Sequence, residues 1–344
     1  MASVFAYNRV QEHRLAARQA RHDKAAGGEA AGATDGAHDS DAATVPPADV
    51  RVEHRFDMQV EEEPLPDMAH ALPSRILDHR LDYIAALSFV AAHPGEEILR
   101  RSAEIVRAAK RVEWEGFSES GSTWEALEPA AQYRQVRAGL QLIDRRGVAT
   151  ETELLSFCHG LQALAVTLVA EIDFPSRAEA LKAAADFDRQ LADLDIQVAL
   201  NVVKIGGPAM AARSLQQAAE AAGAELQSDG RFCVVDGTGA EAFMVANLEP
   251  HPFRDEQLAA MTTRGVTVAM DVPRAPASPE AFQQFVRFAR DLAKTMEADL
   301  VDDNRRPISP TALAAIEREV VRVRTRLAEL GLPAGGALAL RVFA

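Results

Sequence analysis

The residue types that could perform chemistry occur at three places in this sequence. Asp302 and Asp303 are adjacent carboxylates, but neighbouring residues of a strand point to opposite sides, so we expect local ion pairs and helix capping there. Cys158 and His159 lie about 100° apart on a predicted helix, a poor geometry for a nucleophile and its base. The loop at 205–208 lacks the glycine spacing of a phosphate-binding loop. The sequence therefore predicts no enzyme, no cofactor and no metal site.

Composition narrows the class of protein further. The chain has 344 residues, 48% of them apolar, and a formal net charge of −14. A chain this acidic is not expected to bind nucleic acid, because that requires a basic patch. Two cysteines cannot form a disulfide framework, which favours a reducing compartment. No apolar run approaches the roughly 20 residues of a membrane-spanning helix, so the chain as given is expected to be soluble.

The N-terminal part of the chain is expected to lie outside any folded core. In residues 1–24 an apolar stub is followed by a basic cluster, the pattern found on the cytoplasmic side of a membrane anchor. The stub is too short to cross a bilayer, and a frayed amphipathic helix is the alternative interpretation. Residues 25–72 are rich in Ala, Gly, Asp, Glu and Pro, a composition typical of a disordered acidic linker.

The rest of the chain shows one order of elements twice. We predict two tandem units at 75–195 and 196–331, followed by a Gly/Ala-rich tail at 332–344. The strand at 135–144 corresponds to the strand at 264–273, and each is followed by a long helix, at an offset of about 130 residues.

Periodicity and capping residues give the expected elements of these units. Strands are expected at 81–91, 112–117, 133–143, 196–204, 231–235, 242–248 and 265–272, and helices at 96–110, 150–169, 176–194, 208–221, 278–296 and 309–330. The expected helix starts are marked by the caps Thr150 and Ser278 and by the first-turn prolines Pro208 and Pro310.

Three strands of the second unit carry branched residues on one face and small residues on the other. They are 196–203, 242–248 and 265–272. An antiparallel sheet covered by helices on one side produces this asymmetry, so we predict an α+β fold of the split β-α-β type with helices packed on one face. The other face is either a solvated surface or a shallow trough for a peptide, with Met244 and Leu248 as apolar contacts.

Two runs of residues resemble the C-terminal domain of the ZipA family. The first joins 243–248 to 261–273 and contains Thr-Thr-Arg-Gly-Val-Thr, and the second is the Asp-Asp-Asn-Arg-Arg segment at 302–306. ZipA is a bacterial membrane-anchored protein that binds the tubulin-like division protein FtsZ. The likeness covers about 196–330, and the unit at 75–195 is interpreted as a degenerate second copy of the same fold.

The resemblance also implies a binding site. In the family, the C-terminal tail of FtsZ lies in a groove on the open face of the sheet. Ala269 stands where the family typically has a large aromatic residue and Ala199 where it has a branched aliphatic one, so less apolar area would be buried here. The implied groove consists of Gln197, Ala199, Ala246, Leu248, Thr267 and Ala269, with Arg305 near its edge, and the alternation of the strands adds Met244 to the predicted groove.

The function implied by the resemblance is that of a non-catalytic adaptor. It would link FtsZ filaments to the cytoplasmic side of the inner membrane at the division site, through a family-type anchor that is expected to be missing from this chain. The alternatives are a module of the same fold for a different division protein, or an enzyme or small-molecule receptor on this scaffold. Trp114 and Trp124 are expected in the core, and exposure of either would mark a second contact site.

Overall fold

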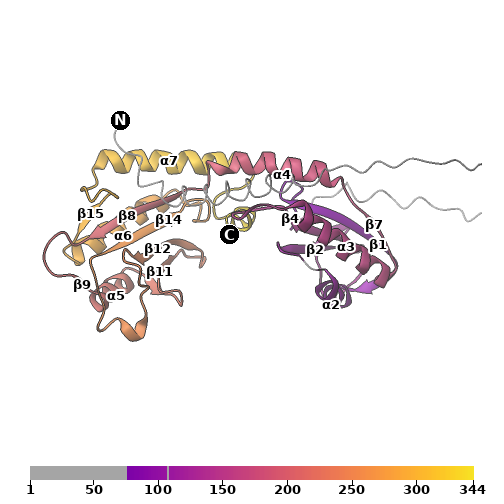
Figure 1. Ribbon diagram of the computed structural model, residues 1–344, viewed down its shortest axis with the longest axis horizontal. Helices are drawn as coiled ribbons and strands as arrows, with labels where there is room; N and C mark the ends of the chain where they lie inside the picture. Colours follow the sequence, from indigo (N-terminus) through magenta and orange to yellow (C-terminus); the bar gives the residue numbers. More distant parts are fainter. Residues whose placement is uncertain (1–75, 107) are drawn as a thin grey trace, which may run out of the picture.

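Two antiparallel sheets, each with helices on one face, make up the part of the chain that the structure describes (Figure 1). The structure is a computed structural model that describes residues 76–106 and 108–344. The predicted basic segment at 1–24 and the acidic linker at 25–72 lie outside the described residues. The predicted α+β class is confirmed, because mixed helices accompany sheets in which every strand pair is antiparallel.

The first sheet has five strands in the order β3-β2-β4-β1-β7. Its strands are β1 (Asp82–Pro94), β2 (Val112–Ser118), β3 (Thr123–Ala126), β4 (Gln132–Gln141) and β7 (Ala170–Asp173). The helices of this part are α2 (Gly95–Ile105), α3 (Glu151–Leu168) and α4 (Arg177–Ala192), and a small hairpin joins β5 (Ile143–Asp144) to β6 (Gly147–Val148). We call the elements from β1 to α4 the first unit.

The second sheet has six strands in the order β10-β11-β12-β14-β8-β15. They are β8 (Gln197–Val203), β10 (Ala224–Leu226), β11 (Phe232–Val235), β12 (Glu241–Asn247), β14 (Gly265–Asp271) and β15 (Asp299–Val301). The remaining elements are the pair β9 (Met210–Ala211) and β13 (Thr262–Thr263), the 3-10 turn η1 (Asp255–Gln257), and the helices α5 (Ala212–Ala221), α6 (Ala281–Thr295) and α7 (Pro310–Glu329). We call the elements from β8 to α7 the second unit.

The core of each unit lies between one face of the sheet and its helices. In the first unit the Tyr83 ring of β1 meets the Phe157 ring of α3 edge to face at 6.4 Å between centroids. In the second unit Phe243 of β12 packs against Phe285 and Phe288 of α6, at 5.7 and 5.1 Å. These residues alternate along the strands with those of the opposite face. The face of each sheet opposite these helices is called its open face below.

The two sheets share their topology at one edge. In the first sheet β1 lies between β4, which precedes helix α3, and β7, which follows α3. In the second sheet β8 lies in the same way between β14, which precedes helix α6, and β15, which follows α6. At the other edge they differ, because β2 lies between β3 and β4, whereas β10, β11, β12 and β14 follow one another in chain order. The correspondence predicted between 135–144 and 264–273 is therefore one between β4 and β14.

Several predicted boundaries differ from the observed ones, among them the end of the helix predicted at 96–110, which ends at Ile105. Helix α5 begins at Ala212, after the short strand β9, so Pro208 is not in its first turn. Helix α6 begins after Glu280, and the Ser278 hydroxyl accepts only the N–H of Glu280, so Ser278 is not its N-cap. The predicted tail contains helix α8 (Ala337–Val342), which is held by contacts with distant residues rather than by its own composition.

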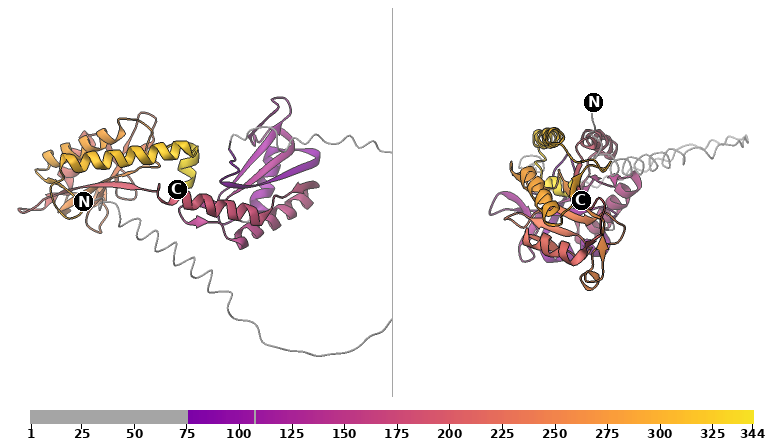
Figure 2. Two further views of the ribbon diagram at one scale, coloured as in Figure 1. Left: turned by 90° about the horizontal axis from the view of Figure 1, so that it is seen from above. Right: turned by 90° about the vertical axis from the view of Figure 1, so that its left-hand side faces the viewer.

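The C-terminal segment lies between the two units (Figures 1 and 2). The Arg341 guanidinium, on α8, forms an ion pair with Asp82 of β1, and both side chains are almost fully buried. Burial raises the pKa of Asp82, and this ion pair opposes the rise. The amide of Gln141 donates to the Arg341 carbonyl at 3.0 Å, and Arg274 of the second unit donates to the Phe343 carbonyl at 3.1 Å. Helix α8 thus bridges both units.

A second bridge joins the units through the hairpin loop between β5 and β6. Arg145 in this loop reaches Asp195, just before β8, and Asp271, the last residue of β14, with shortest N–O distances of 2.7 Å to each. Burial works against the charge on Arg145, but Asp271 and Asp195 hold its pKa above the ordinary value. The relative position of the units therefore depends on buried charge pairs as well as on α8.

None of the helices in the described residues has the length and apolar character that crossing a membrane requires.

Candidate binding face of the second sheet

Cross-strand register brings the predicted groove residues onto one face. Met244 of β12 lies opposite Ala269 of β14, which in turn lies opposite Ala199 of β8. Residues directly opposite each other in an antiparallel sheet point to the same side. These residues alternate with Val245, Val268 and Leu200, which face the helices. This first row continues to Cys233 of β11.

Two neighbouring rows complete this face. Ala246 lies opposite Thr267, and Thr267 lies opposite Asn201. The next row brings together Leu248, Gly265 and Val203, since the Leu248 N–H donates to the Gly265 carbonyl and Gly265 pairs with Val203. At the other end, Gln197 lies opposite Asp271. Of the eight predicted groove residues, Gln197, Ala199, Met244, Ala246, Leu248, Thr267 and Ala269 therefore share one face, while Arg305 lies in the loop after β15.

Exposure is graded across this face. Leu248 has 41% of its surface exposed, while the other groove residues on the strands are half-buried, except Ala269, which is buried. A Cβ at Gly265 would lie 3.0 Å from a Leu248 methyl carbon, so the glycine allows Leu248 to lie against the sheet. The result is a shallow surface with small side chains in the middle and one exposed leucine at the end of β12.

A polar network crosses the centre of the face. The Thr267 hydroxyl donates to the side-chain amide oxygen Oδ1 of Asn201 at 2.7 Å, and the side-chain amide nitrogen of Asn201 donates to the Asp303 carboxylate at 3.0 Å. The Asp302 carboxylate accepts the backbone N–H groups of Asn304 and Arg306, which closes the loop. Asp302 therefore shapes its own loop and Asp303 joins the loop to the sheet, rather than forming a catalytic pair.

The position of Arg305 follows from this loop. Its backbone is in the left-handed region, with a φ of +58°, and its side chain is exposed. The helix that follows is capped by Ser309, whose hydroxyl accepts the Ala312 N–H, so the expected capping role of Asp302 and Asp303 is wrong. The structure places Arg305 near the edge of the face, on the loop that Asp303 joins to Asn201.

The Thr-Thr-Arg-Gly run has a structural role beside the face. The Thr263 hydroxyl donates to Asn247 at 2.7 Å and accepts the Gly265 N–H at 3.1 Å, while Thr263 itself pairs with Met210 of β9. Since Asn247 is the last residue of β12, this hydroxyl fixes the end of β12 against the start of β14. The motif thereby holds Leu248 and Gly265 in register.

Sequence reasoning missed Cys233 as a member of this face. It is buried, and burial, followed by the neighbouring Glu241 carboxylate, raises the pKa of its thiol to about 11. A thiol with so high a pKa stays protonated at neutral pH and is a poor nucleophile. The sequence does not show that Cys233 lies opposite Met244, because the four residues of β11 are too few for alternation to indicate which of them face the open side of the sheet.

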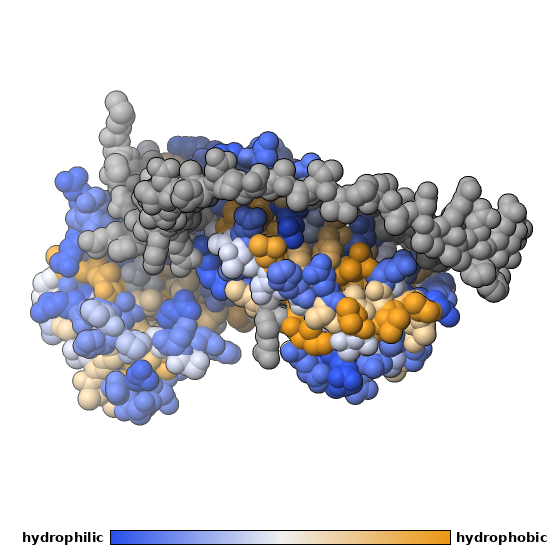
Figure 3. Space-filling model, turned by 45° about the vertical axis from the view of Figure 1, so that its right-hand side comes forward, coloured by the Kyte–Doolittle hydropathy of each residue, from blue (hydrophilic) through white to orange (hydrophobic). Residues whose placement is uncertain are grey.

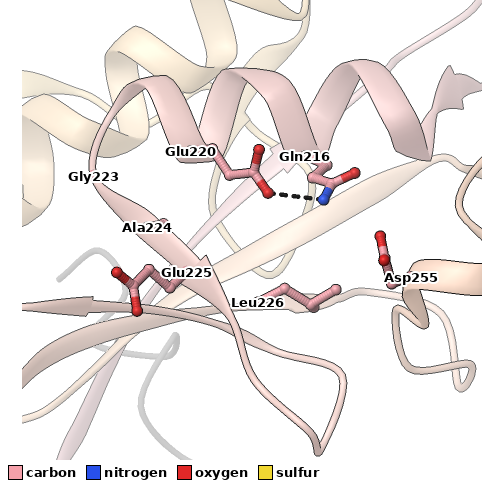
Figure 4. Close-up of a pocket in the computed structure, with 7 residues that line it drawn as sticks. All are labelled: Gln216, Glu220, Gly223, Ala224, Glu225, Leu226 and Asp255. Atoms are coloured by element: carbon pink, nitrogen blue, oxygen red, sulfur yellow. Dashed lines mark hydrogen bonds between the residues drawn. The ribbon is translucent and has the colours of Figure 1, made fainter.

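The second unit also has a cavity of about 480 Å³ away from this face. Figure 4 shows Gln216 and Glu220 on one side of α5, joined by a hydrogen bond, with Asp255 across from them. The lining consists of Gln216, Glu220, Gly223, Ala224, Glu225, Leu226 and Asp255. The lining offers carboxylates and an amide but no thiol, hydroxyl or imidazole, and no cluster of metal-binding side chains occurs within the described ranges.

Apolar surface is also visible on the first unit (Figure 3). Val90 of β1, Val166 of α3 and Val169 after α3 are all more than half exposed, and the Val90 N–H donates to the Val169 carbonyl. Nothing local in the sequence indicates this patch, because the exposure of residues at the end of a helix depends on which neighbours pack there.

Comparison with known proteins concerns the second unit. Residues 197–319 match the family model described as ZipA, C-terminal FtsZ-binding domain. A cell division protein ZipA of Vibrio vulnificus strain YJ016 is 26% identical over 101 residues, which cover 29% of this chain and 32% of the relative. The ZipA proteins of Vibrio campbellii and Vibrio parahaemolyticus are 28% and 29% identical over 98 residues, covering 28% of this chain and 30% and 31% of theirs.

The aligned segments thus span about a third of the length of these curated relatives. The matched residues begin with β8 and end within α7, so they include every strand of the second sheet. The resemblance to the ZipA C-terminal domain family, inferred from the residues at 243–273 and 302–306, is confirmed for residues 197–319.

Proposed function

We propose that the open face of the second sheet binds the C-terminal tail of FtsZ, and that the protein is a non-catalytic adaptor of cell division. The observation that carries the proposal is the register described above, in which seven of the eight predicted groove residues share one face. The family match over the same strands supports the partner.

The mode of binding follows from the surface. A disordered tail can lie along a shallow face, where its apolar side chains contact Met244 and Leu248. The small Ala199 and Ala269 leave room for the tail but offer little area, so affinity per contact is modest. Many tails on one filament raise the effective concentration, and a family-type N-terminal anchor would hold the complex at the inner membrane.

The test is a titration of the whole chain with a labelled peptide from the FtsZ C-terminal tail of the same organism. The chain is kept to its last residue, because truncation after 331 would remove α8 from between the units. Fluorescence anisotropy is expected to give saturable binding in the micromolar range. No binding up to millimolar peptide would contradict the proposal and favour a different division protein as partner.

The decisive variant is Leu248→Glu. Placing a charge on the most exposed apolar residue of the face should weaken binding by about 1–3 kcal/mol, the range of an interface hot spot. The matched control is Val321→Glu on the outer side of α7, where a similarly exposed residue lies away from the sheet. Equal affinity of both variants would move the binding site away from this face.

A further inference from the structure

The first sheet has an open face that corresponds to the proposed binding face of the second. Tyr83, Ala85 and Leu87 of β1 face the core, so Ile84 and Ala86, which alternate with them, lie on the open face. On this open face Glu115 of β2 lies opposite Arg137 of β4, and Phe117 of β2 lies opposite Trp124 of β3. By topology, β4 and β1 occupy the places of β14 and β8.

The burial of this face differs from that of its counterpart. Trp124 is 2% exposed, Glu115 0% and Arg137 7%, whereas most groove residues of the second sheet are half-buried. The Arg137 guanidinium stacks on the Trp124 ring at 3.9 Å from its centroid, which accounts for part of this burial. Since residues on the uncovered side of a sheet normally keep contact with water, another segment must lie on this face. Trp124 is thus buried as expected, and it marks no exposed contact site.

The described chain already shows where this segment begins. The backbone N–H of Ile76 donates to the Glu115 carboxylate at 2.7 Å, and that of Leu77 approaches the same oxygen at 3.4 Å. A Cβ at Gly139 would lie 2.4 Å from a Leu77 methyl carbon, so Leu77 packs directly on β4 where the glycine leaves room for it. The Ile76 carbonyl accepts from Arg341 at 2.9 Å.

These contacts give the segment a direction. Leu77 lies over Gly139, which pairs with Glu113, and Ile76 lies at Glu115, the next residue of β2 on this face. Continued upstream, the path leads to the row of Phe117 and Trp124, one further step along β2. Such a step is about 6.6 Å along a strand, so two to four extended residues span it.

We propose that the residues just before Ile76, Leu72-Pro73-Ser74-Arg75, dock in cis on the open face of the first sheet and cover Trp124. Leu72 is the apolar residue of this stretch and the one suited to the indole ring. The Trp124 indole N–H is buried and has no acceptor in the described part of the chain, which makes it available to a backbone carbonyl of the docked segment. The first unit is then a copy of the fold whose face is filled by its own chain.

The consequence concerns the number of binding faces. Because the segment is joined directly to Ile76, its effective concentration at the first face is high, and a free peptide in solution competes poorly. One chain therefore binds one tail, on the second sheet. This inference does not depend on the identity of that tail.

The test uses the fluorescence of Trp124 in the background Trp114→Phe, which leaves one tryptophan in the chain. Deletion of residues 1–75 is expected to shift the emission to the red and to raise acrylamide quenching several-fold, whereas deletion of 1–63 leaves both unchanged. A peptide of residues 64–75 added in excess should reverse the shift. Unchanged emission after deletion of 1–75 would overturn the proposal.

Further measurements separate docking in cis from a free segment, from a second copy of the chain and from an unfolded variant. Hydrogen exchange of the intact chain should show the amides of 72–77 protected relative to those of 25–60, and equal rates would contradict docking without any variant. If the protection or the blue-shifted emission falls on dilution, the segment comes from a second copy and the cis proposal is wrong. Unaltered far-UV circular dichroism of the deletion variant confirms that it is folded.

Discussion

At the scale of single residues, the small side chains of the second open face set how tightly it can bind. Ala199 is half-buried and ends the row of Cys233, Met244 and Ala269 on this face, since β15 pairs with β8 only at Asn201–Val203. A larger residue there adds apolar wall without disturbing the core, because Val198 and Leu200 on either side hold the strand. The family's branched residue at this position suggests the direction of the change.

We therefore expect Ala199→Ile to tighten binding of the FtsZ tail peptide by about 3- to 10-fold, from the added apolar area at about 25 cal/mol per Å². Anisotropy titration measures it, with Ala91→Ile on β1 as the control for a larger residue in an exposed strand. Unchanged affinity would mean that the peptide does not reach Ala199. Weaker binding would mean that its backbone needs the space.

Cys233 gives a prediction about pH on the same face. Its thiol has a pKa of about 11 in the folded chain, above the ordinary value of 9.0, so the neutral form persists well above neutral pH. The neutral thiol favours the folded state, and this contribution to stability is lost as the pH rises from about 9 toward 11. At pH 8 we expect iodoacetamide to label Cys233 at least tenfold more slowly than in urea, as measured by peptide mass spectrometry. Equal rates would show that the thiol is exposed.

At the scale of elements, some helices have an N-cap side chain that accepts a backbone N–H of the first turn, and others have none. The Ser309 hydroxyl accepts the Ala312 N–H at 3.1 Å, and Pro310 occupies the first turn of α7. Loss of such a cap costs about 0.5–2 kcal/mol. Ser309→Ala should lower the free energy of unfolding by this amount in urea denaturation. Ser278→Ala should lower it less, because Glu280 is the N-cap of α6. A larger effect at Ser278 would contradict this assignment.

Long elements with clear periodicity could be predicted from the sequence, and short ones could not. The capping box of Thr150 and Glu153 and the helix it starts are as predicted, since the pattern extends over many residues. Strands β7, β10 and β15 have three or four residues each, too few to show alternation. These strands form because each pairs with a neighbouring strand, and that pairing depends on residues distant in the sequence.

The same distinction applies to the candidate site. Alternation in β8, β12 and β14 was enough to predict a face that shares Ala199, Ala246 and Ala269, because the period of a strand needs no tertiary information. The contact between Asn201 and Asp303 joins residues a hundred positions apart, and nothing local indicates it. The role of the face as a binding site stays a prediction until the titration is done.

At the scale of the whole molecule, the buried charges between the units decide whether the two sheets move together. Arg145 forms ion pairs with both Asp195 and Asp271, and all three side chains are at most 15% exposed. Removing one partner of a buried pair is costly, because the remaining charge has no counter-ion. Asp271 also lies opposite Gln197 at the end of the proposed binding face, so the same contact borders the site.

We expect Arg145→Ala to lower the free energy of unfolding by about 2–5 kcal/mol and to increase the radius of gyration in solution scattering. The matched control is Arg189→Ala on α4, whose ion pair with Asp186 is exposed and should contribute less than about 0.5 kcal/mol. Equal, small effects of both would mean that α8 alone holds the units. If peptide affinity stays within about twofold in Arg145→Ala while the units separate, the second open face binds independently of the first unit. A loss of affinity would show that the interface shapes the end of the face.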